Sequence, residues 1–275
     1  MRARRVEPEW LDELPALDPR AVRARADLRR VNRLMGASGI LRHALDTCIA
    51  DAGADVAATA DGRVGAAFQP RSSGGRTKSR AWKGAPTRKT TGLRLVELGT
   101  GDGTLALALA RRRASRWPGA AITLLDRRPA VAAGTLATMR ALGWRVEVVV
   151  ADAIEWLERT EPEDADRPVM FANLFVHHFA GEGLARLLAG AAGRAQAFVC
   201  VEPRRSGVAL AGSRLLGLIG ANDVTRHDGV ASVRAGFRDG ELGAAWSEAA
   251  GADWAVTERP AGLFSHLFMA RRAHG

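Results

Sequence analysis

The stretch VELGTGDGT, Val96 to Thr104, follows an apolar run and places three glycines at alternate positions beside two carboxylates, Glu97 and Asp102. A glycine-rich turn between a strand and a helix usually receives a phosphate, because bare backbone N–H groups and the helix N-terminus attract anions. Two acids beside the turn would repel a phosphate. The stretch therefore predicts a strand-to-helix turn whose ligand approaches the backbone closely and carries positive charge.

Short apolar runs alternate with alanine-rich helical stretches after this turn. We expect strands at 93–98, 121–126, 144–150, 168–174 and 196–202, and helices near 104–113, 129–142 and 182–192. Such alternation predicts a parallel sheet covered by helices on both faces. Two last runs, 253–259 and 262–270, are separated only by Pro260 to Gly262, a turn that joins antiparallel neighbours. The predicted fold is an α/β doubly wound, seven-stranded sheet, mostly parallel with an antiparallel last strand.

Three regions follow from composition. Residues 1–56 show helical spacing and predict an N-terminal helical cap, and 57–92 are rich in Gly, Ser, Thr and Pro and predict a flexible basic insertion. That insertion holds eight basic residues and one acid, which is +7 of the chain's formal charge of +10. We expect residues 93–275 to form the ligand-binding domain, with 203–252 as a lid over the site.

The remaining composition is that of an ordinary globular chain. No uncharged run reaches the length needed to cross a bilayer, so we expect a cytoplasmic protein. Cys48 and Cys200 are too few for a disulfide framework, and Cys200 lies in an apolar run, which favours a buried free thiol.

Each of the five predicted parallel strands ends in a polar group. In an open parallel sheet, ligands bind outside the carboxyl ends of the strands, so these groups are the candidate site. The third glycine of a dinucleotide fingerprint is absent, because Thr104 stands at its position. The polar strand ends are Glu97, Asp126, Asp152, Asn173 and Glu202.

These motifs resemble those of the class I, Rossmann-like S-adenosylmethionine-dependent methyltransferases. VELGTGDGT resembles their first motif, Asp126 the ribose-binding acid, Asp152 the acid facing the adenine amino group, and NLFVHHF (173–179) the motif after strand four. The resemblance implies S-adenosylmethionine as cofactor, a ligand with an ammonium and a sulfonium and no phosphate. The residues it implies for cofactor binding are Glu97, Gly99, Thr100, Gly101, Gly103, Asp126, Arg127, Asp152, Ala153 and Asn173; Asn32 and Arg33 are further candidates for the cofactor's carboxylate.

The acceptor is less defined than the cofactor. The chain lacks the Asn/Asp-Pro-Pro-aromatic motif of amine and amide methyltransferases, and no cluster of acids indicates a metal, so we expect an oxygen or carbon acceptor on a small molecule and no metal. The segments VEPRRS (201–206) and GLFSHLFMA (262–270) also resemble those of bacterial methyltransferases found beside type III polyketide synthases. This resemblance implies a phenolic or polyketide-derived acceptor. Glu202, Arg204 and Arg205 are candidates for binding an acidic or phenolate acceptor.

Three histidines are candidate general bases, because imidazole titrates near neutral pH. His177 and His178 follow strand four, with a purely structural role as the alternative, and His227 precedes Asp228, which either orients it or caps a helix. Two other functions stay open: an RNA methyltransferase that uses the basic residues 71–89, and a cofactor-binding protein without catalysis. We expect a monomer or a homodimer, and nucleic acid is the less favoured partner.

Overall fold

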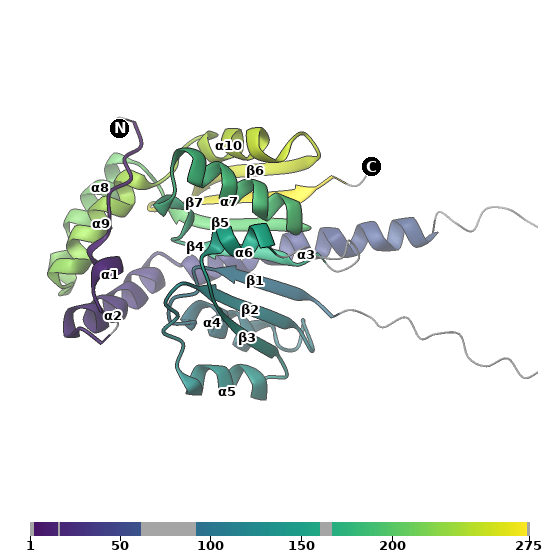
Figure 1. Ribbon diagram of the computed structural model, residues 1–275, viewed down its shortest axis with the longest axis horizontal. Helices are drawn as coiled ribbons and strands as arrows, with labels where there is room; N and C mark the ends of the chain where they lie inside the picture. The colour runs from purple at the N-terminus through teal and green to yellow at the C-terminus, as the bar shows by residue number, and fades with distance from the viewer. Residues whose placement is uncertain (1–2, 16, 62–91, 160–166, 274–275) are drawn as a thin grey trace, which may run out of the picture.

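The computed structural model describes residues 3–15, 17–61, 92–159 and 167–273 (Figure 1). Seven strands form one sheet in the order β3-β2-β1-β4-β5-β7-β6. Their bounds are β1 Arg94–Leu98, β2 Ala121–Asp126, β3 Arg145–Val150, β4 Val169–Asn173, β5 Ala197–Pro203, β6 Trp254–Ala261 and β7 Ser265–Arg272. Strands β1 to β5 pair in parallel, and β7 pairs antiparallel with both β5 and β6. The predicted fold class is confirmed, with the antiparallel strand inserted between β5 and β6.

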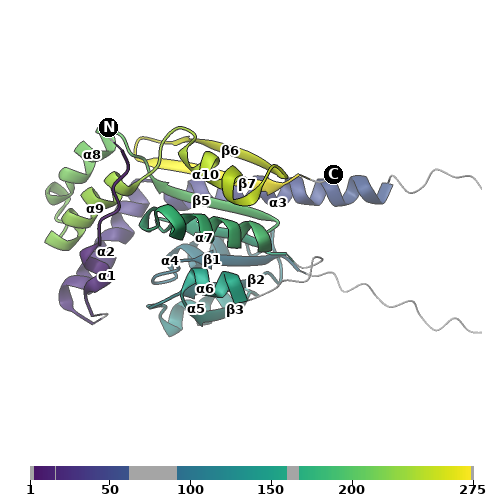
Figure 2. The same ribbon diagram turned by 45° about the horizontal axis from the view of Figure 1, so that its top comes forward.

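Helices cover both faces of the sheet (Figures 1 and 2). One face packs against α3 (Ala37–Asp61), α4 (Thr104–Arg113) and α5 (Ala133–Ala141), and the other against α6 (Ala153–Arg159), α7 (Gly181–Arg194) and α10 (Glu241–Ala250). Alternate strand residues serve the two faces: Phe171 belongs to the first core, while Met170 and Ala172 belong to the second. Period-two alternation of wholly apolar strands is what a sheet buried on both sides requires.

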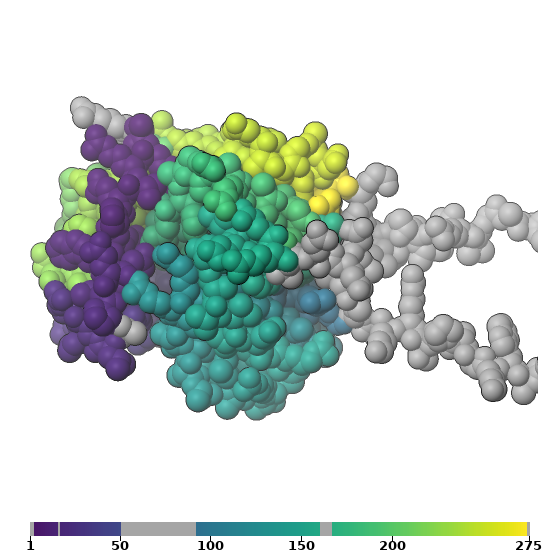
Figure 3. All heavy atoms as spheres, viewed as in Figure 1, coloured from purple at the N-terminus to yellow at the C-terminus, as the bar shows by residue number. Residues whose placement is uncertain are grey.

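The remaining helices gather at one end of the sheet, where Figure 1 shows them side by side. These are α1 (Trp10–Glu13), α2 (Pro19–Leu34), α8 (Gly207–Arg214) and α9 (Asp223–Ala235), with the short 3-10 turns η2 (Val176–His178) and η3 (Leu216–Ile219). Both α1 and α2 pack against α9, and α8 packs against α9 as well. In the space-filling view the N-terminal segment runs along this end of the molecule (Figure 3).

The structure refines three predictions about the regions outside the sheet. The predicted cap divides, because α3 packs against β5 and β7 of the sheet while α1 and α2 lie against α9. The predicted lid divides too, because α10 packs on α7 and β6 and leaves only α8, η3 and α9 at the site. Helix α3 continues to Asp61, five residues into the predicted insertion, and residues 62–91 lie outside the described part of the chain.

Two helices were absent from the sequence prediction. Helix α9 has Asn222 as its N-cap, whose side chain accepts a hydrogen bond from the Thr225 N–H at 2.9 Å. Asp228 therefore lies inside α9, and the alternative that it caps this helix is wrong. Helix α6, the second of the two, begins at Ala153, three residues after the end of β3 at Val150. Within the described ranges, no helix is both long enough and apolar enough to cross a bilayer.

Candidate functional site

The strand order reverses between β1 and β4, and the glycine turn lies at this point. The connection that leaves β1 leads to β2 on one side, and the connection that leaves β4 leads to β5 on the other side. This divergence leaves a crevice at the carboxyl ends of β1 and β4. The turn is fixed to the end of β2: the N–H groups of Gly99 and Thr100 both donate to the Leu125 carbonyl, at 2.9 and 3.1 Å. The predicted ligand site therefore has a rigid backbone floor.

The three glycines of the turn all have positive φ, for different reasons. A Cβ on Gly99 would lie 2.2 Å from the Phe175 ring, so this glycine lets the β4 turn pack on the β1 turn. A Cβ on Gly103 would touch Val131 at 3.0 Å. A Cβ on Gly101 would meet no atom within 4 Å, and Gly101 is the position of the three that faces open space. Close approach of a ligand to the backbone is therefore possible at Gly101.

Four carboxylates surround this turn. Glu97 is 2 % exposed and accepts a hydrogen bond from the Thr100 hydroxyl at 2.7 Å. Asp126 accepts the N–H groups of Gly101 and Arg128 at 2.9 and 2.8 Å. Asp102 pairs with Arg29 of α2 at 2.7 Å, and Asp152 caps α6. The turn is thus an acidic pocket edge, unsuited to a phosphate and suited to a cation.

Glu97 responds most strongly to this concentration of charge. Burial raises the pKa of Glu97, the hydrogen bond from Thr100 opposes that rise, and the negative charges of Asp102 and Asp126 add to it, so that the pKa reaches about 8. At neutral pH the carboxyl group is therefore mostly protonated until a cation lies beside it.

Asn173 and Asp152 complete the line of strand ends. The Asn173 Oδ1 atom at the end of β4 is buried and has no hydrogen-bond partner among the described residues. Asp152 uses Oδ1 to accept the N–H groups of Ile154 and Glu155, at 2.9 and 3.2 Å. The buried Asn173 oxygen requires a donor, because an unsatisfied buried polar atom costs about 1–3 kcal/mol. A ligand at the crevice can supply one.

The other predicted cofactor residues lie along the same edge. Arg127 is exposed after Asp126, and Ala153 is buried as the first residue of α6. Arg33 is exposed on α2, whereas the Asn32 Oδ1 atom is buried without a partner in the described structure. The contact from α2 to the glycine turn is instead made by Arg29, which sequence reasoning missed because only the packing of α2 brings it to Asp102.

A second group of polar residues lies beneath the N-terminal segment. The Glu202 carboxylate, fully buried, accepts the N–H groups of Phe175, Val176 and His177 at 3.0 to 3.2 Å and binds the His177 Nδ1 atom at 2.7 Å. His177 Nε2 lies 3.3 Å from Glu9. Glu202 therefore organises η2.

These contacts decide the state of the two adjacent histidines. Burial lowers the pKa of His177, but its hydrogen bonds with Glu202 and Glu9 outweigh burial and raise the pKa to about 9. Burial and the neighbouring His177 charge lower the pKa of His178. With both ring nitrogens engaged, His177 matches the structural alternative better than the role of general base.

His227 also lies away from the glycine turn. Its ring stacks on Trp10 with centroids 3.9 Å apart, and its Nδ1 atom lies 3.0 Å from Asp228. Asp228 in turn accepts the N–H groups of Trp10 and Leu11 at 2.9 and 3.0 Å, which caps α1. Asp228 thus orients His227 and holds the N-terminal segment against α9.

The arginines after β5 lie beside acids of the protein itself. Arg205 is 2 % exposed, donates to the Gly236 carbonyl at 3.2 Å and pairs with Glu241. Arg204 lies 3.9 Å from Asp239. Glu202 and Arg205 thus have partners inside the protein, whereas Arg204 remains partly exposed, and binding of an acidic or phenolate acceptor by these residues stays a prediction.

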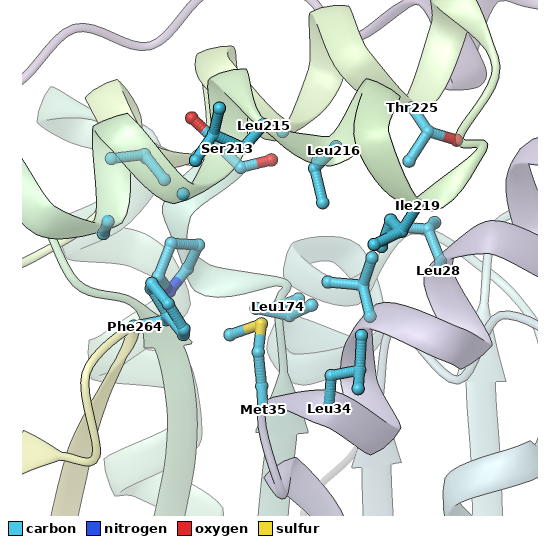
Figure 4. Close-up of a pocket in the computed structure, with 17 residues that line it drawn as sticks. Leu28, Leu34, Met35, Leu174, Ser213, Leu215, Leu216, Ile219, Thr225 and Phe264 are labelled. Atoms are coloured by element: carbon cyan, nitrogen blue, oxygen red, sulfur yellow. The ribbon is translucent and has the colours of Figure 1, made fainter.

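An apolar pocket of about 270 Å³ lies among the helices gathered at one end of the sheet (Figure 4). Its walls come from α2, α8, η3 and α9, with Leu174 from the end of β4 at its floor. Leu28, Leu34, Met35, Leu215, Leu216, Ile219 and Phe264 line it with carbon. Three hydroxyls, of Ser213, Thr225 and Ser232, are the polar side chains in the lining, and each is hydrogen-bonded within the protein. The pocket accepts an apolar molecule.

The pocket and the glycine turn share two elements. Leu174 follows Asn173 directly, so the floor of the pocket and the buried amide lie next to each other in the chain. Helix α2 carries Arg29, which contacts Asp102, and Val31, which lines the pocket. The polar site and the apolar pocket are therefore adjacent chambers, one suited to a cation and one to a hydrocarbon.

No family model and no curated protein matches this chain. Among solved structures, it is similar to the pyocyanin biosynthetic protein PhzM at 22% identity, over 68% of this chain and 52% of that one, with a TM-score of 0.45. It is similar to the small RNA methyltransferase HEN1 at 14% identity (68% and 24% covered, TM-score 0.43) and to the N-terminal domain of EvdMO1 with SAH bound at 19% identity (66% and 75%, TM-score 0.41). The chain thus spans about half the length of PhzM.

The class of fold follows from the sheet itself. Strand order 3-2-1-4-5-7-6 with β7 antiparallel is the Rossmann-like arrangement that the resemblance to class I methyltransferases implies. The chain has this fold, with helices on both faces and the acidic glycine turn at the reversal of strand order.

The charge of Glu97 should be visible in the pH dependence of stability. A folded-state pKa of about 8, above the ordinary value of 4.5, means that the folded protein binds a proton which the unfolded chain has released. Stability from this group is full below about pH 4.5 and is lost as pH rises toward 8. Each tenfold change in proton affinity corresponds to about 1.4 kcal/mol, so the free energy of unfolding of the unmodified protein should fall by on the order of a few kcal/mol between pH 5 and 8. Glu97→Gln, which cannot ionise, should not show this fall.

Urea unfolding at several pH values measures this difference. Glu147→Gln, on the exposed side of β3, is the matched control and should follow the unmodified protein. Parallel stability curves for Glu97→Gln and the unmodified protein would show that Glu97 is ionised in the folded state.

Proposed function

We propose that this protein is an S-adenosylmethionine-dependent methyltransferase that transfers a methyl group to an oxygen or carbon of an apolar small molecule. The observation that carries the proposal is the acidic glycine turn at the reversal of strand order, next to an apolar pocket. The cofactor's adenosine and amino-acid parts suit the polar chamber, and the acceptor suits the apolar one.

The residues present fit this cofactor. Gly101 offers open space at the backbone, and the buried Asn173 oxygen lacks a donor. The carboxylates of Glu97, Asp102 and Asp126 favour a ligand with ammonium and sulfonium groups over a nucleotide phosphate. The bound cofactor supplies an electrophilic methyl group.

The chain's own residues then have defined tasks. We assign the ribose to Asp126, the adenine amino group to Asp152, and the cofactor's ammonium to the neighbourhood of Glu97. A cation beside Glu97 favours its ionised form, so binding is accompanied by release of a proton from that carboxyl at neutral pH. Gly99, Thr100, Gly103, Arg127 and Ala153 shape the surrounding backbone.

The acceptor class follows from the pocket. A lining of leucine, methionine and phenylalanine side chains offers burial of apolar area, about 25 cal/mol per Å², and no charged partner. This supports a phenolic or polyketide-derived acceptor over an acidic one. Methyl transfer requires that the acceptor and the methyl group are held in line and that water is excluded. The apolar walls of the pocket exclude water.

A general base remains a prediction. None of His177, His178 and His227 belongs to the pocket lining. Although burial opposes them, the hydrogen bonds of His177 with Glu202 and Glu9 raise its pKa to about 9, so without a bound metal ion it is a poor base at neutral pH. Burial and the charge of His177 lower the pKa of His178, which favours its neutral form and makes it the better base of the two adjacent histidines. A carbon acceptor, or a phenol already ionised in solution, would need no base at all.

The alternatives of an RNA enzyme and of a non-catalytic binder are less favoured. The basic residues 71–89 lie outside the described part of the chain, and an apolar pocket offers no phosphate contacts. The proposal extends to a cytoplasmic location and to the part of residues 57–92 that follows α3 as an insertion between the N-terminal helices and the domain of residues 93–275. It leaves the chain as a monomer or a homodimer.

The cofactor assignment can be tested at Asp126. Asp126→Ala should weaken S-adenosylmethionine binding by on the order of 1–3 kcal/mol, because charged hydrogen bonds to the ribose are lost. Isothermal titration calorimetry measures it, with Asp253→Ala, an exposed acid after α10, as control. Equal affinity in both variants would refute the ribose assignment.

The function itself is tested by transfer of labelled methyl from S-adenosylmethionine into fractionated extract of the source cells. We expect label in the organic-solvent fraction, and the same yield from a protein that lacks residues 71–89. Label in the nucleic-acid fraction, lost on that deletion, would establish the RNA enzyme instead. Cofactor binding without label in any fraction would support the non-catalytic alternative.

The pocket can be filled from within. Leu216, half-buried on η3, lines the pocket, whereas Leu218 on the same turn is 82 % exposed and does not. Leu216→Trp should lower kcat/KM for the labelled acceptor by on the order of tenfold or more, because the larger ring occupies its space. Leu218→Trp should leave it unchanged. Cofactor affinity, measured by calorimetry, should be equal in both variants; equal transfer rates would place the acceptor elsewhere.

A further inference from the structure

Glu9, His177 and His178 bring three metal-binding side chains together beneath the N-terminal segment. One ligand atom from each lies within 4.8 Å of the other two. Glu9 and His177 are 168 residues apart in the chain, so no sequence motif announces the cluster. The side chains of Glu9, His177 and His178 are 13, 2 and 28 % exposed. The group is therefore largely shielded and has one side near the surface.

The distance between His177 and Glu9 suits a shared metal ion as well as the hydrogen bond that the two groups make without one. His177 Nε2 lies 3.3 Å from the Glu9 oxygen, longer than the roughly 2.7–2.9 Å that is usual for a charged N–H···O bond. Ligand atoms at two corners of a tetrahedral zinc site, each about 2.0–2.1 Å from the ion, stand about 3.3 Å apart. The pair already has the spacing of two zinc ligands.

The partners behind these ligands are those that a metal site requires. His177 Nδ1 is bound to the buried Glu202 at 2.7 Å, which leaves Nε2 as the atom directed at Glu9. Histidine ligands of zinc are held in this way by a carboxylate on the other ring nitrogen. The Glu9 oxygen accepts the Ser232 hydroxyl, and the Asp12 carboxylate lies 3.7 Å from His178 Nδ1. Two of the three ligands, His177 and Glu9, are therefore oriented by a hydrogen bond from a second group.

From this geometry we propose that Glu9, His177 and His178 form a zinc site. Two imidazoles and one carboxylate are a donor set that zinc prefers and that calcium and magnesium do not. The His178 ring lies 4.3 Å from the His177 ring, centroid to centroid, and one of its nitrogens lies within 4.8 Å of the ligand atoms of the other two residues. Three protein ligands leave a fourth position open, as in catalytic zinc sites.

The site adjoins the acceptor pocket. Ser232 lines that pocket and also binds Glu9. An open zinc position on this side is suited to an oxygen of the acceptor, and with zinc bound neither His177 nor His178 is available as a base. This use of the zinc rests on the proposed function; the zinc site itself does not.

Zinc content tests the proposal independently of any activity. The full-length protein is dialysed against a chelator, reloaded with zinc chloride, passed through a desalting column and measured by atomic emission. We expect about one zinc per chain, a raised melting temperature on reloading, and absorption bands of low-symmetry cobalt when cobalt chloride replaces zinc. His178→Ala and Glu9→Gln should each weaken zinc binding at least about tenfold.

His43→Ala is the matched control, because His43 is an exposed histidine on α3, outside the cluster and outside the N-terminal segment that carries Glu9. It should retain zinc like the unmodified protein, and circular dichroism should show all variants folded without metal. Less than about a tenth of a zinc per chain in the unmodified protein would overturn the proposal. So would equal zinc affinity in His178→Ala and His43→Ala, since the metal would then be bound elsewhere.

Discussion

The common direction of β1 to β5 is the constraint on which the rest of this structure depends. Parallel strands bring all their carboxyl ends to one edge of the sheet, so residues far apart in the chain meet there. Glu97, Asp126, Asp152 and Asn173 share an edge for this reason alone. The reversal of strand order between β1 and β4 then opens a crevice among them, and the antiparallel β7 lies between β5 and β6, away from that crevice.

The buried acid at the first strand end gives this edge its chemical character. Glu97 is surrounded by protein, bonded to Thr100 and placed near two other carboxylates, so its proton is held more tightly than in water. Ionisation of Glu97 is unfavourable in this site, and a cationic ligand beside the carboxyl group makes it favourable. The glycine turn that resembles a phosphate cradle is thus adapted to the opposite charge, which supports the proposed cofactor.

The second organising group is Glu202 at the end of β5. It satisfies three backbone N–H groups of the β4 turn and orients His177, which in turn meets Glu9 from the N-terminal segment. Asp228 holds the same segment by its backbone at α1. Buried carboxylates thus replace the hydrogen bonds that an irregular turn cannot make for itself. They position α1 and α9 beside the apolar pocket and the proposed zinc ligands.

The sequence by itself determined the sheet and the acidic turn, because both depend on local patterns. Apolar runs of strand length, glycine at positive φ and acids at strand ends are written in consecutive residues, and all seven strands lie where these patterns predict. Only the tertiary structure decided which helices face the site. Arg29 at Asp102, Glu9 at His177 and Ser232 in the pocket wall are contacts between segments up to 223 residues apart. Such contacts arise from how amphipathic helices pack, and helical spacing shows that a helix has an apolar face without showing what that face will meet.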